Sequence, residues 1–397
     1  MTNRFTRHSY FNYSICLLLV AAFFSPIPAQ SLPEPTRERL LNGLDVLFWQ
    51  RSSDADVLLK LRVQSGAAFD LAGKGGTMAL LGDALFPDPA TREYVAEQLG
   101  GRLEVSTDYD RIDITISGKA SELERMVDLL RSAVVTTQLS PEIVARLQDA
   151  RVKRLTDKPA SSSEIADQAI AARLFGNFPY GHPVSGTLES VTKIERGDLM
   201  QARERFINAD NATLVVIGGV EKLRLLRALR QLLGPWQKGD RAVPLTFRQP
   251  NAPDSRVLAV NQPGATTADV RLAVRGLAHS DRDAAAASML ALIARDQWQA
   301  ASPELSSAFA RHEAHALPGL FVLGASVPTA SASKAISSGQ QVLRALAQAG
   351  PTATELEKAR AGINLAISRA PSTSAVELGD PSLMTDSTES HTEVSAC

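Results

Sequence analysis

The sequence is poor in cysteine, in aromatic residues and in net charge. Of its 397 residues two are cysteine and 5% are aromatic, and the formal net charge is -1. Cys16 lies in an N-terminal apolar stretch and Cys397 is the last residue, so removal of that stretch would leave no pair to form an internal disulfide. Without a surplus of basic residues to neutralise phosphates, the composition argues against a nucleic-acid partner.

The N-terminus has the pattern of a targeting segment. Arg4 and Arg7 precede the apolar run 15–24, which is shorter than the roughly 20 residues that span a bilayer. The stretch 26–29 then supplies a small-residue cleavage site before Gln30. We therefore expect a secretory signal over residues 1–29 and export across an inner membrane to the periplasm, with an uncleaved membrane anchor as the alternative.

Hydrophobic periodicity predicts a first α+β domain over residues 32–233. Isoleucines alternate with polar residues between 112 and 116, which is typical of a strand with one buried face. Asn42-Gly43 predicts a two-residue turn between strands, and Ser121 is expected to cap a helix. The predicted strands are the two that flank Asn42-Gly43, the second of them at 46–49, followed by 57–63, 102–107, 112–116 and 212–217. The predicted helices are 75–86, 89–99, 121–135, 141–155, 163–175, 197–206 and 221–233.

The same order of elements returns after a Pro-rich and charged linker at 234–253. A second domain is expected at 254–369, so the fold class is α+β with two homologous domains, each a mainly antiparallel sheet with helices packed on one face. Residues 370–397 are rich in Ser, Thr and Glu and are predicted to be disordered. The second domain then looks truncated, either genuinely or through a changed reading frame, and its sheet would have an unprotected edge. Its predicted elements are the strands 270–276 and 320–327 and the helices 282–298, 333–349 and 352–368.

Several motifs carry a resemblance to a known family. From residue 40 to about 369 the chain resembles the insulinase-like (pitrilysin) zinc metallopeptidases, together with mitochondrial processing peptidase and the cytochrome bc1 core subunits. The most specific segment is 174–220. The motifs are the Asn42-Gly43 turn, the helix ending Leu85-Phe86, the run 97–103, and the segments 174–176, 182–191 and 211–220.

The resemblance implies a zinc site that this chain lacks. Active members carry His-x-x-Glu-His on the helix equivalent to 75–86, where two histidines bind zinc and the glutamate activates water. These places fall on Ala79, Gly82 and Asp83, and the region of the third ligand holds Ala150 and Arg151. We therefore expect no catalytic residue, no metal and no cofactor here. The helix is expected to persist because its apolar face, Met78, Leu81 and Leu85, packs on the sheet.

The histidines offer one alternative site. His312 and His315 are three residues apart, a spacing that a helix would bring to one face. A polar loop or helix end before the strand at 320 is the ordinary interpretation, and a rearranged metal site is the alternative. His182 is expected to be a hydrogen-bonded structural residue.

The resemblance also implies a function without catalysis. Family members commonly work as pairs that enclose an unfolded peptide, so we expect the substrate-binding or structural partner of an active zinc peptidase subunit, in a heterodimer. Such partners often use an Arg and Tyr pair in the second half; Arg311 is near that region but no tyrosine follows Tyr180, so no role is assigned. The alternatives are a free-standing peptide-binding or scaffold protein and a metallopeptidase with a rearranged site.

Overall fold

Six strands form the first sheet, in the order β1-β2-β6-β3-β5-β4. The computed structural model describes residues 34–239, 247–251 and 256–369. Neighbouring strands are antiparallel except β2 and β6, which run parallel. The predicted signal at 1–29, the tail at 370–397 and parts of the linker lie outside the described residues. The strands are β1 (Thr36–Arg39), β2 (Asp45–Gln50), β3 (Asp56–Val63), β4 (Arg102–Thr107), β5 (Ile112–Lys119) and β6 (Ala212–Gly218).

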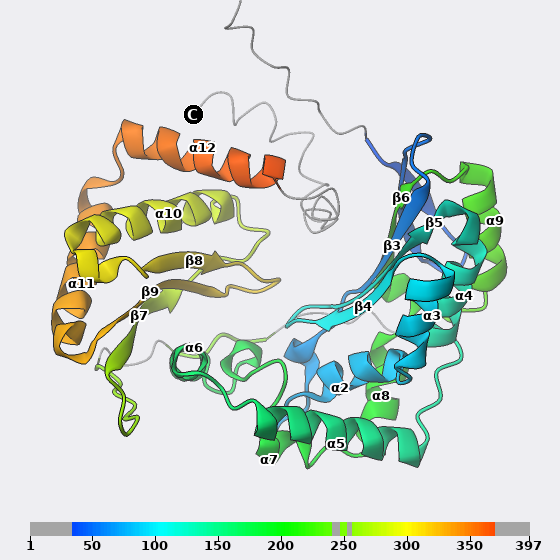
Figure 1. Cartoon of the computed structure of the whole chain (residues 1–397), viewed down its shortest axis with the longest axis horizontal. Helices are drawn as coiled ribbons and strands as arrows, with labels where there is room; N and C mark the ends of the chain where they lie inside the picture. Colours follow the sequence, from blue (N-terminus) through cyan, green and yellow to red (C-terminus); the bar gives the residue numbers. More distant parts are fainter. Residues whose placement is uncertain (1–33, 240–246, 252–255, 370–397) are drawn as a thin grey trace, which may run out of the picture. The chain divides into compact units, whose positions relative to one another are not determined.

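Helices cover one face of this sheet (Figure 1). Alternate residues of β3, such as Leu59 and Leu61, are 0% exposed because their side chains point at the helices. The opposite face carries a smaller cluster around Leu47, Val215 and Ile217. The helices of this region are α2 (Thr77–Leu85), α3 (Ala90–Gln98), α4 (Leu123–Val134), α5 (Pro141–Asp157), α6 (Ser162–Phe175), α7 (Leu188–Val191), α8 (Arg196–Phe206) and α9 (Lys222–Leu232).

One local prediction in this region is confirmed only in part, and another is wrong. β1 and β2 form the predicted antiparallel hairpin, but its connection is longer than a two-residue turn: the N–H of Leu40 donates to the Leu44 carbonyl and the N–H of Gly43 to the Leu40 carbonyl, both at 2.9 Å, and Gly43 has φ 90°. The Asn42 side chain instead donates to the carbonyls of Leu233 (2.8 Å) and Trp236 (3.1 Å), which ties this loop to the end of α9. Ser121 lies within a short 3-10 turn, and its side chain does not cap α4.

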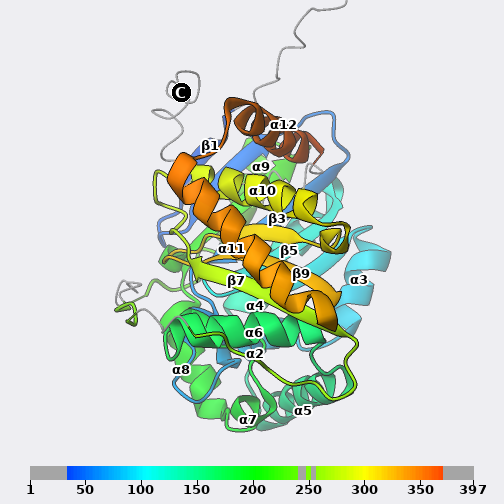
Figure 2. The same ribbon diagram turned by 90° about the vertical axis from the view of Figure 1, so that its left-hand side faces the viewer.

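Three antiparallel strands form the second sheet, in the order β7-β9-β8. Figure 2 shows α11 crossing β7 and β9, and α10 packs on β8 and β9 beside α12. Trp298 of α10 is 0% exposed at the centre of this core. The elements are β7 (Thr267–Arg275), α10 (Ala284–Ala301), β8 (Phe309–Glu313), β9 (Leu320–Pro328), α11 (Ala332–Ala349) and α12 (Ala353–Arg369).

The predicted fold class is confirmed: both sheets are mainly antiparallel and pack against helices. The order β7-β9-β8 repeats the order β3-β5-β4, each strand in the same sequence relation to its neighbours. Duplication and the domain boundaries stay predictions, and the described residues from Thr36 onward form one compact unit. Within the described ranges, none of the helices combines the length and the apolar character that a bilayer crossing requires.

Candidate functional site

The helix α2 begins at a tightly hydrogen-bonded turn. Gly76 precedes it with φ 94°, a conformation that side chains rarely adopt, and the Asp70 carboxylate accepts the backbone N–H groups of Gly76 (2.6 Å) and Met78 (2.8 Å). Burial raises the pKa of Asp70 to about 7, although these two hydrogen bonds and the charge of Arg151 act in the opposite direction. Asp70 thus anchors the N-terminus of α2 through a carboxylate that titrates near neutral pH.

One guanidinium ties α2 to α5. Arg151 of α5 is 9% exposed, and its Nη2 donates to the carbonyl of Ala79 (3.0 Å) and to Asp83 Oδ2 (2.6 Å). Arg154, one turn later, donates to the same Asp83 oxygen at 2.8 Å. The Ala79–Asp83 side of α2 is therefore occupied by a charge-assisted network.

The neighbouring position on α2 is closed by the sheet. A Cβ atom added at Gly82 would lie 2.6 Å from Thr107 Oγ1 of β4. Met78 and Leu81 are 0% exposed and Leu85 is 3% exposed, so the predicted packing of this apolar face is confirmed. The absence of a side chain at Gly82 lets the helix approach β4 closely.

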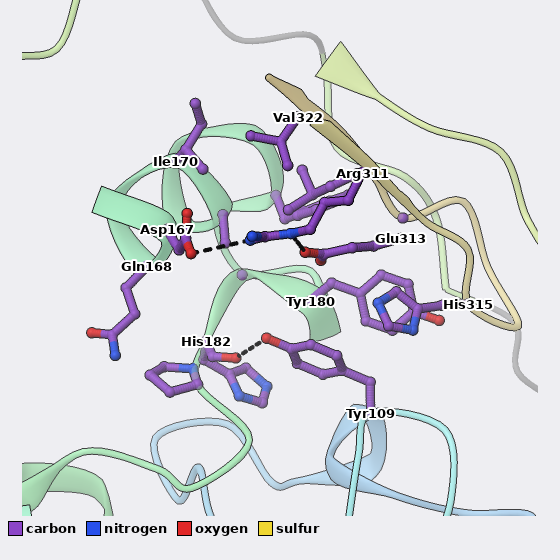
Figure 3. Close-up of a pocket in the computed structure, with 16 residues that line it drawn as sticks. Tyr109, Asp167, Gln168, Ile170, Tyr180, His182, Arg311, Glu313, His315 and Val322 are labelled. Carbon is purple, nitrogen blue, oxygen red and sulfur yellow. Dashed lines mark hydrogen bonds and ion pairs between the residues drawn. The ribbon is translucent and has the colours of Figure 1, made fainter. Parts of the chain in front are cut away.

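A separate cavity of about 190 Å³ is lined by α6, by the loop around residue 180 and by β8 and β9 (Figure 3). Its apolar wall comes from Ile170, Ala171, Phe175, Leu320 and Val322. The remaining lining is mostly polar or aromatic, with two glycines and one proline: Tyr109, Asp167, Gln168, Tyr180, Gly181, His182, Pro183, Arg311, Glu313, His315 and Gly319. We call this cavity the α6–β8 pocket.

Ion pairs form one end of the α6–β8 pocket. Arg311 lies between Asp167 and Glu313, with Nη2 3.1 Å from Asp167 Oδ2 and Nε paired to Glu313 (Figure 3). Arg271 of β7, buried with a side chain 4% exposed, pairs with the other Asp167 oxygen at 2.5 Å. The guanidinium carbons of Arg271 and Arg311 lie 4.9 and 5.0 Å from the centre of the Phe309 ring. The two arginines balance the two carboxylates, so this end is polar without a large net charge.

Aromatic and histidine side chains form the other end of the pocket. The Tyr180 hydroxyl donates to Asp110 Oδ1 (2.9 Å) and accepts the backbone N–H of Leu317 (3.0 Å), and Asp110 Oδ2 lies 3.4 Å from His315 Nδ1. Burial, followed by the nearby Asp110 charge, raises the pKa of Tyr180 far above its ordinary value. The phenol therefore stays protonated and is committed to hydrogen bonds, which suits it to positioning rather than to proton abstraction.

The sequence of the chain matches a peptidase family. Residues 193–363 match the family profile described as "Peptidase M16 inactive domain". Human cytochrome b-c1 complex subunit 1 is 25% identical over 222 residues, which cover 54% of this chain and 46% of that protein. An uncharacterized zinc protease of Mycobacterium leprae is 24% identical over 203 residues, covering 50% of this chain and 46% of the relative. The matched region thus spans about half the length of these curated relatives.

The fold is also that of solved relatives. The crystal structure of a peptidase M16 inactive domain from Pseudomonas fluorescens superposes with a TM-score of 0.78 at 18% identity and covers 88% of each chain. The resemblance to the peptidase M16, or insulinase-like, family is confirmed.

The positions that this M16 resemblance assigns to zinc do not fit a metal ion. Ala79 and Gly82 have no donor atom, and the Asp83 carboxylate already faces two guanidinium groups that would repel a second cation. At the third position Arg151 cannot lose its proton to become a ligand. The site is closed by Arg151 and Thr107, and we derive no catalytic step through a metal.

The fold does not bring His312 and His315 together on a helix. His312 belongs to the strand β8, and His315 follows in the turn before β9. His312 Nε2 accepts the backbone N–H of Leu277 (3.0 Å), its Nδ1 lies 3.3 Å from Ser288 Oγ, and burial lowers its pKa. Both ring nitrogens of His312 are engaged, and among the residues that the structure describes no group of three His, Cys, Asp or Glu side chains could hold a metal.

His182 lines the pocket, and its backbone and its ring make different contacts. Its backbone carbonyl accepts the Tyr109 hydroxyl at 2.7 Å, whereas its ring Nδ1 is buried without a hydrogen-bond partner in the described part of the chain. Burial lowers the pKa of His182, so the ring is neutral near pH 7. A hydrogen bond with the Pro183 backbone acts in the opposite direction on this pKa, so the expected hydrogen-bonded ring is confirmed for that contact and not for Nδ1.

The sequence alone did not predict which tyrosines would lie in the same pocket as Arg311. No tyrosine follows Tyr180, yet Tyr109 and Tyr180 from the first half line the same pocket as Arg311. It also missed that Arg151 would bind Asp83, although the charged pair in the two expected ligand regions was a usable signal. The pocket itself depends on packing between segments that are more than a hundred residues apart.

Proposed function

We propose that this chain is a non-catalytic M16 subunit that binds unfolded peptide beside an active zinc peptidase subunit. The carrying observation is the Arg151–Asp83 pair, which joins two of the positions that the resemblance assigns to zinc ligands in a chain whose fold matches that of solved relatives. The charge of the buried Arg151 side chain is compensated by Asp83, so these positions are stable without a metal ion.

The α6–β8 pocket is the proposed peptide contact. Its volume of about 190 Å³ suits one medium or large side chain, and its wall of Ile170, Phe175 and Val322 would bury an apolar one. The polar rim around Arg311 and Glu313 offers hydrogen bonds to a peptide backbone. Binding without cleavage is the activity that this arrangement supports.

The proposal also includes a partner subunit and a cellular location for this chain. Human cytochrome b-c1 complex subunit 1 is named as part of a complex, and a structural match of TM-score 0.69 is named as complex III2 from Candida albicans. We infer that this chain likewise works in an assembly, as a heterodimer with an active M16 subunit. The Arg4, Arg7 and apolar pattern supports export to the periplasm.

The absence of catalysis is tested on the purified full chain. We expect less than about 0.1 zinc per chain by mass spectrometry after dialysis, and no cleavage of an unfolded fluorogenic peptide, because the ligands of a site that wants about four are missing. Chelator-sensitive cleavage that persists across independent preparations would overturn the proposal.

Peptide binding is tested with a matched pair of substitutions on one helix. Ala171→Trp fills the pocket, whereas Ala172→Trp adds the same ring to the adjacent exposed position of α6. In fluorescence anisotropy with a labelled unfolded peptide, Ala171→Trp should weaken binding about tenfold, equivalent to about 1.4 kcal/mol, and Ala172→Trp should leave it unchanged. Equal effects of the two substitutions would remove the pocket from the proposal.

Co-purification separates the partnered form from the free-standing scaffold. A tagged chain expressed with an M16 subunit that carries His-x-x-Glu-His should retain that subunit at equal stoichiometry through size exclusion. Peptide binding by the chain alone, with no retention of such a subunit at micromolar concentration, would favour the free-standing peptide-binding protein.

A further inference from the structure

One carboxylate oxygen of the α6–β8 pocket is open to a ligand. Glu313 of β8 pairs with Arg311 Nε through Oε1, whereas its Oε2 accepts no hydrogen bond from the residues that the structure describes. The Glu313 side chain is 30% exposed, and Figure 3 shows it between Arg311 and the ring of Tyr109. Burial and then the Glu313 charge raise the pKa of Tyr109 to about 12, so this charge acts across the pocket on the phenol. Oε2 thus offers an acceptor at the pocket wall.

The ion pairs around Glu313 favour a neutral donor over a cation. The second carboxylate, Asp167, has Arg271 on Oδ1 (2.5 Å) and Arg311 Nη2 on Oδ2 (3.1 Å), so both of its oxygens are occupied. A cationic side chain that approached Glu313 would lie beside the Arg311 guanidinium, which repels it. A neutral O–H group satisfies the carboxylate without that repulsion and forms a charge-assisted hydrogen bond.

The rings that line the pocket favour an aromatic carrier for this donor. The ring centres of Tyr109 and Tyr180 lie 5.1 Å apart, and those of Phe175 and Tyr180 lie 5.8 Å apart at an interplanar angle of 90°. Both tyrosine hydroxyls are already used, by the His182 carbonyl and by Asp110, so these residues offer a ligand their rings and not their hydroxyls. A further ring packs well in such a group, with centres about 4.5 to 7 Å apart.

We propose that the α6–β8 pocket takes a tyrosine side chain of the bound peptide, and that Glu313 sets this specificity. The incoming ring packs against Tyr109 and Phe175, and its hydroxyl donates to Glu313 Oε2. A leucine side chain would fill the apolar wall but leave the Glu313 oxygen desolvated without a donor. A glutamate side chain would place a second negative charge beside it.

This inference rests on the proposed function, because it names the side chain that the proposed peptide contact takes. The two are separated by peptides that differ in a single residue. Binding as such tests the proposed function, and the preference among side chains tests the inference.

The first experiment compares peptides on the unchanged full chain. The probe is a fluorescein-labelled, unstructured Gly- and Ser-rich peptide with one tyrosine at its centre, and its relatives carry phenylalanine, leucine, lysine or glutamate in that place. In fluorescence anisotropy the tyrosine peptide should bind about tenfold more tightly than the phenylalanine peptide, equivalent to about 1.4 kcal/mol, because only tyrosine gives Glu313 a donor. The leucine, lysine and glutamate peptides should bind more weakly than the tyrosine peptide as well.

A peptide with O-methyltyrosine tests the direction of the hydrogen bond. This residue keeps the ring and the oxygen but has no proton to donate, so its peptide should bind no more tightly than the phenylalanine peptide. Binding as tight as that of the tyrosine peptide would mean that the ligand oxygen accepts a hydrogen bond instead, and would overturn the role of Glu313.

Glu313→Gln tests the residue itself, since glutamine keeps the shape of the side chain and removes its charge. The ratio of tyrosine to phenylalanine affinity should fall from about ten to about two or less, because the charge-assisted hydrogen bond is lost. A change that only disturbed the fold would weaken both peptides and leave the ratio as it was. The matched control is Glu304→Gln, the same substitution at an exposed position of the short helix Pro303–Leu305, which should keep the ratio at about ten.

The results distinguish a failure of the inference from a failure of the proposed function. Equal affinity for all peptides, or tighter binding of the leucine or lysine peptide, would overturn the tyrosine specificity and leave peptide binding intact. A ratio that Glu313→Gln does not change would remove Glu313 as its cause. No saturable binding of any peptide would overturn the proposed peptide contact and the inference with it.

Discussion

The two sheets use equivalent strands in different surroundings. β3 lies inside a six-stranded sheet and its Leu59 is 0% exposed, whereas β7 lies at the edge of a three-stranded sheet and its Leu272 is partly exposed. Both strands follow the same order relative to their neighbours. The comparison shows that the place of a strand in its sheet, more than its own apolar content, decides how far its apolar side chains are buried.

The largest expected effect comes from one substitution made in both sheets. Leu59→Ala should lower the free energy of unfolding by about 3 kcal/mol, because it leaves a cavity in a closed core. Leu272→Ala, aligned with it through the Asp-Val pairs, should cost about 1 kcal/mol because its site is partly open to solvent. Urea unfolding followed by circular dichroism measures both, and equal losses would break the comparison.

Arg151→Met should come next, with a loss of about 2 kcal/mol. The substitution keeps the side-chain volume but removes the buried hydrogen bonds to Ala79 and Asp83. Arg154→Met is the matched control, since Arg154 meets the same Asp83 oxygen from a side chain 62% exposed and should cost less than about 0.5 kcal/mol. Comparable losses in urea unfolding would contradict a buried role for Arg151.

Asp70 should make stability depend on pH by about 1 to 2 kcal/mol, less than the roughly 4 kcal/mol of the full pKa change, because its side chain is partly exposed to solvent. Burial raises the pKa of Asp70 from 3.8 to about 7 in the folded state, so the folded state binds this proton more tightly than the unfolded one. Its contribution is present below pH 3.8 and is lost as pH rises to about 7. Asp70→Asn should remove that slope from a series of melting temperatures between pH 4 and 8.

The control for this series is Asp88→Asn. Asp88 is an exposed carboxylate that likewise accepts a backbone N–H, from Ala90 at 3.0 Å. This variant should keep the slope of the unchanged protein. A slope that Asp70→Asn leaves intact would assign the pH dependence to another group.

The smallest expected effect concerns the hydrogen bonds through which Tyr180 joins Asp110, in the β4–β5 turn of the first sheet, to Leu317, in the β8–β9 turn of the second. Tyr180→Phe removes the hydrogen bond to Asp110, near the β4–β5 turn, and leaves the Leu317 N–H without its acceptor. We expect a loss of about 1 kcal/mol and a wider separation of the unfolding transitions of the two sheets. Tryptophan fluorescence and circular dichroism should then report different midpoints, and coincident midpoints would show that other contacts couple the sheets.

Periodic patterns were sufficient to predict most elements, because a buried face imposes its repeat on the sequence. The strand Arg102–Thr107 and the helix Ala332–Ala349 lie within one residue of their predicted bounds. The length of the Asn42 turn and the Ser121 cap were wrong because other partners, the α9 carbonyls and a 3-10 turn, determine the local conformation.

The candidate site was less accessible from sequence than the fold. The loss of metal ligands was readable at Ala79 and Gly82, since alanine and glycine carry no donor in any structure. The position of His312 on a strand could not be predicted from the sequence, because tertiary contacts with Leu277 and Ser288 hold its side chain. The pocket that joins Tyr180 to Arg311 arises from packing of distant segments and leaves no local pattern.

The Arg151–Asp83 pair has a consequence for the evolution of the chain. Replacing Asp83 by a histidine would take away the carboxylate beneath a buried guanidinium, and replacing Arg151 by a glutamate would set two carboxylates side by side. A glutamate at Gly82 would in addition press against Thr107. Each single substitution toward the family's zinc ligands is thus unfavourable before a metal ion can bind, so the pair disfavours the appearance of a zinc site one residue at a time.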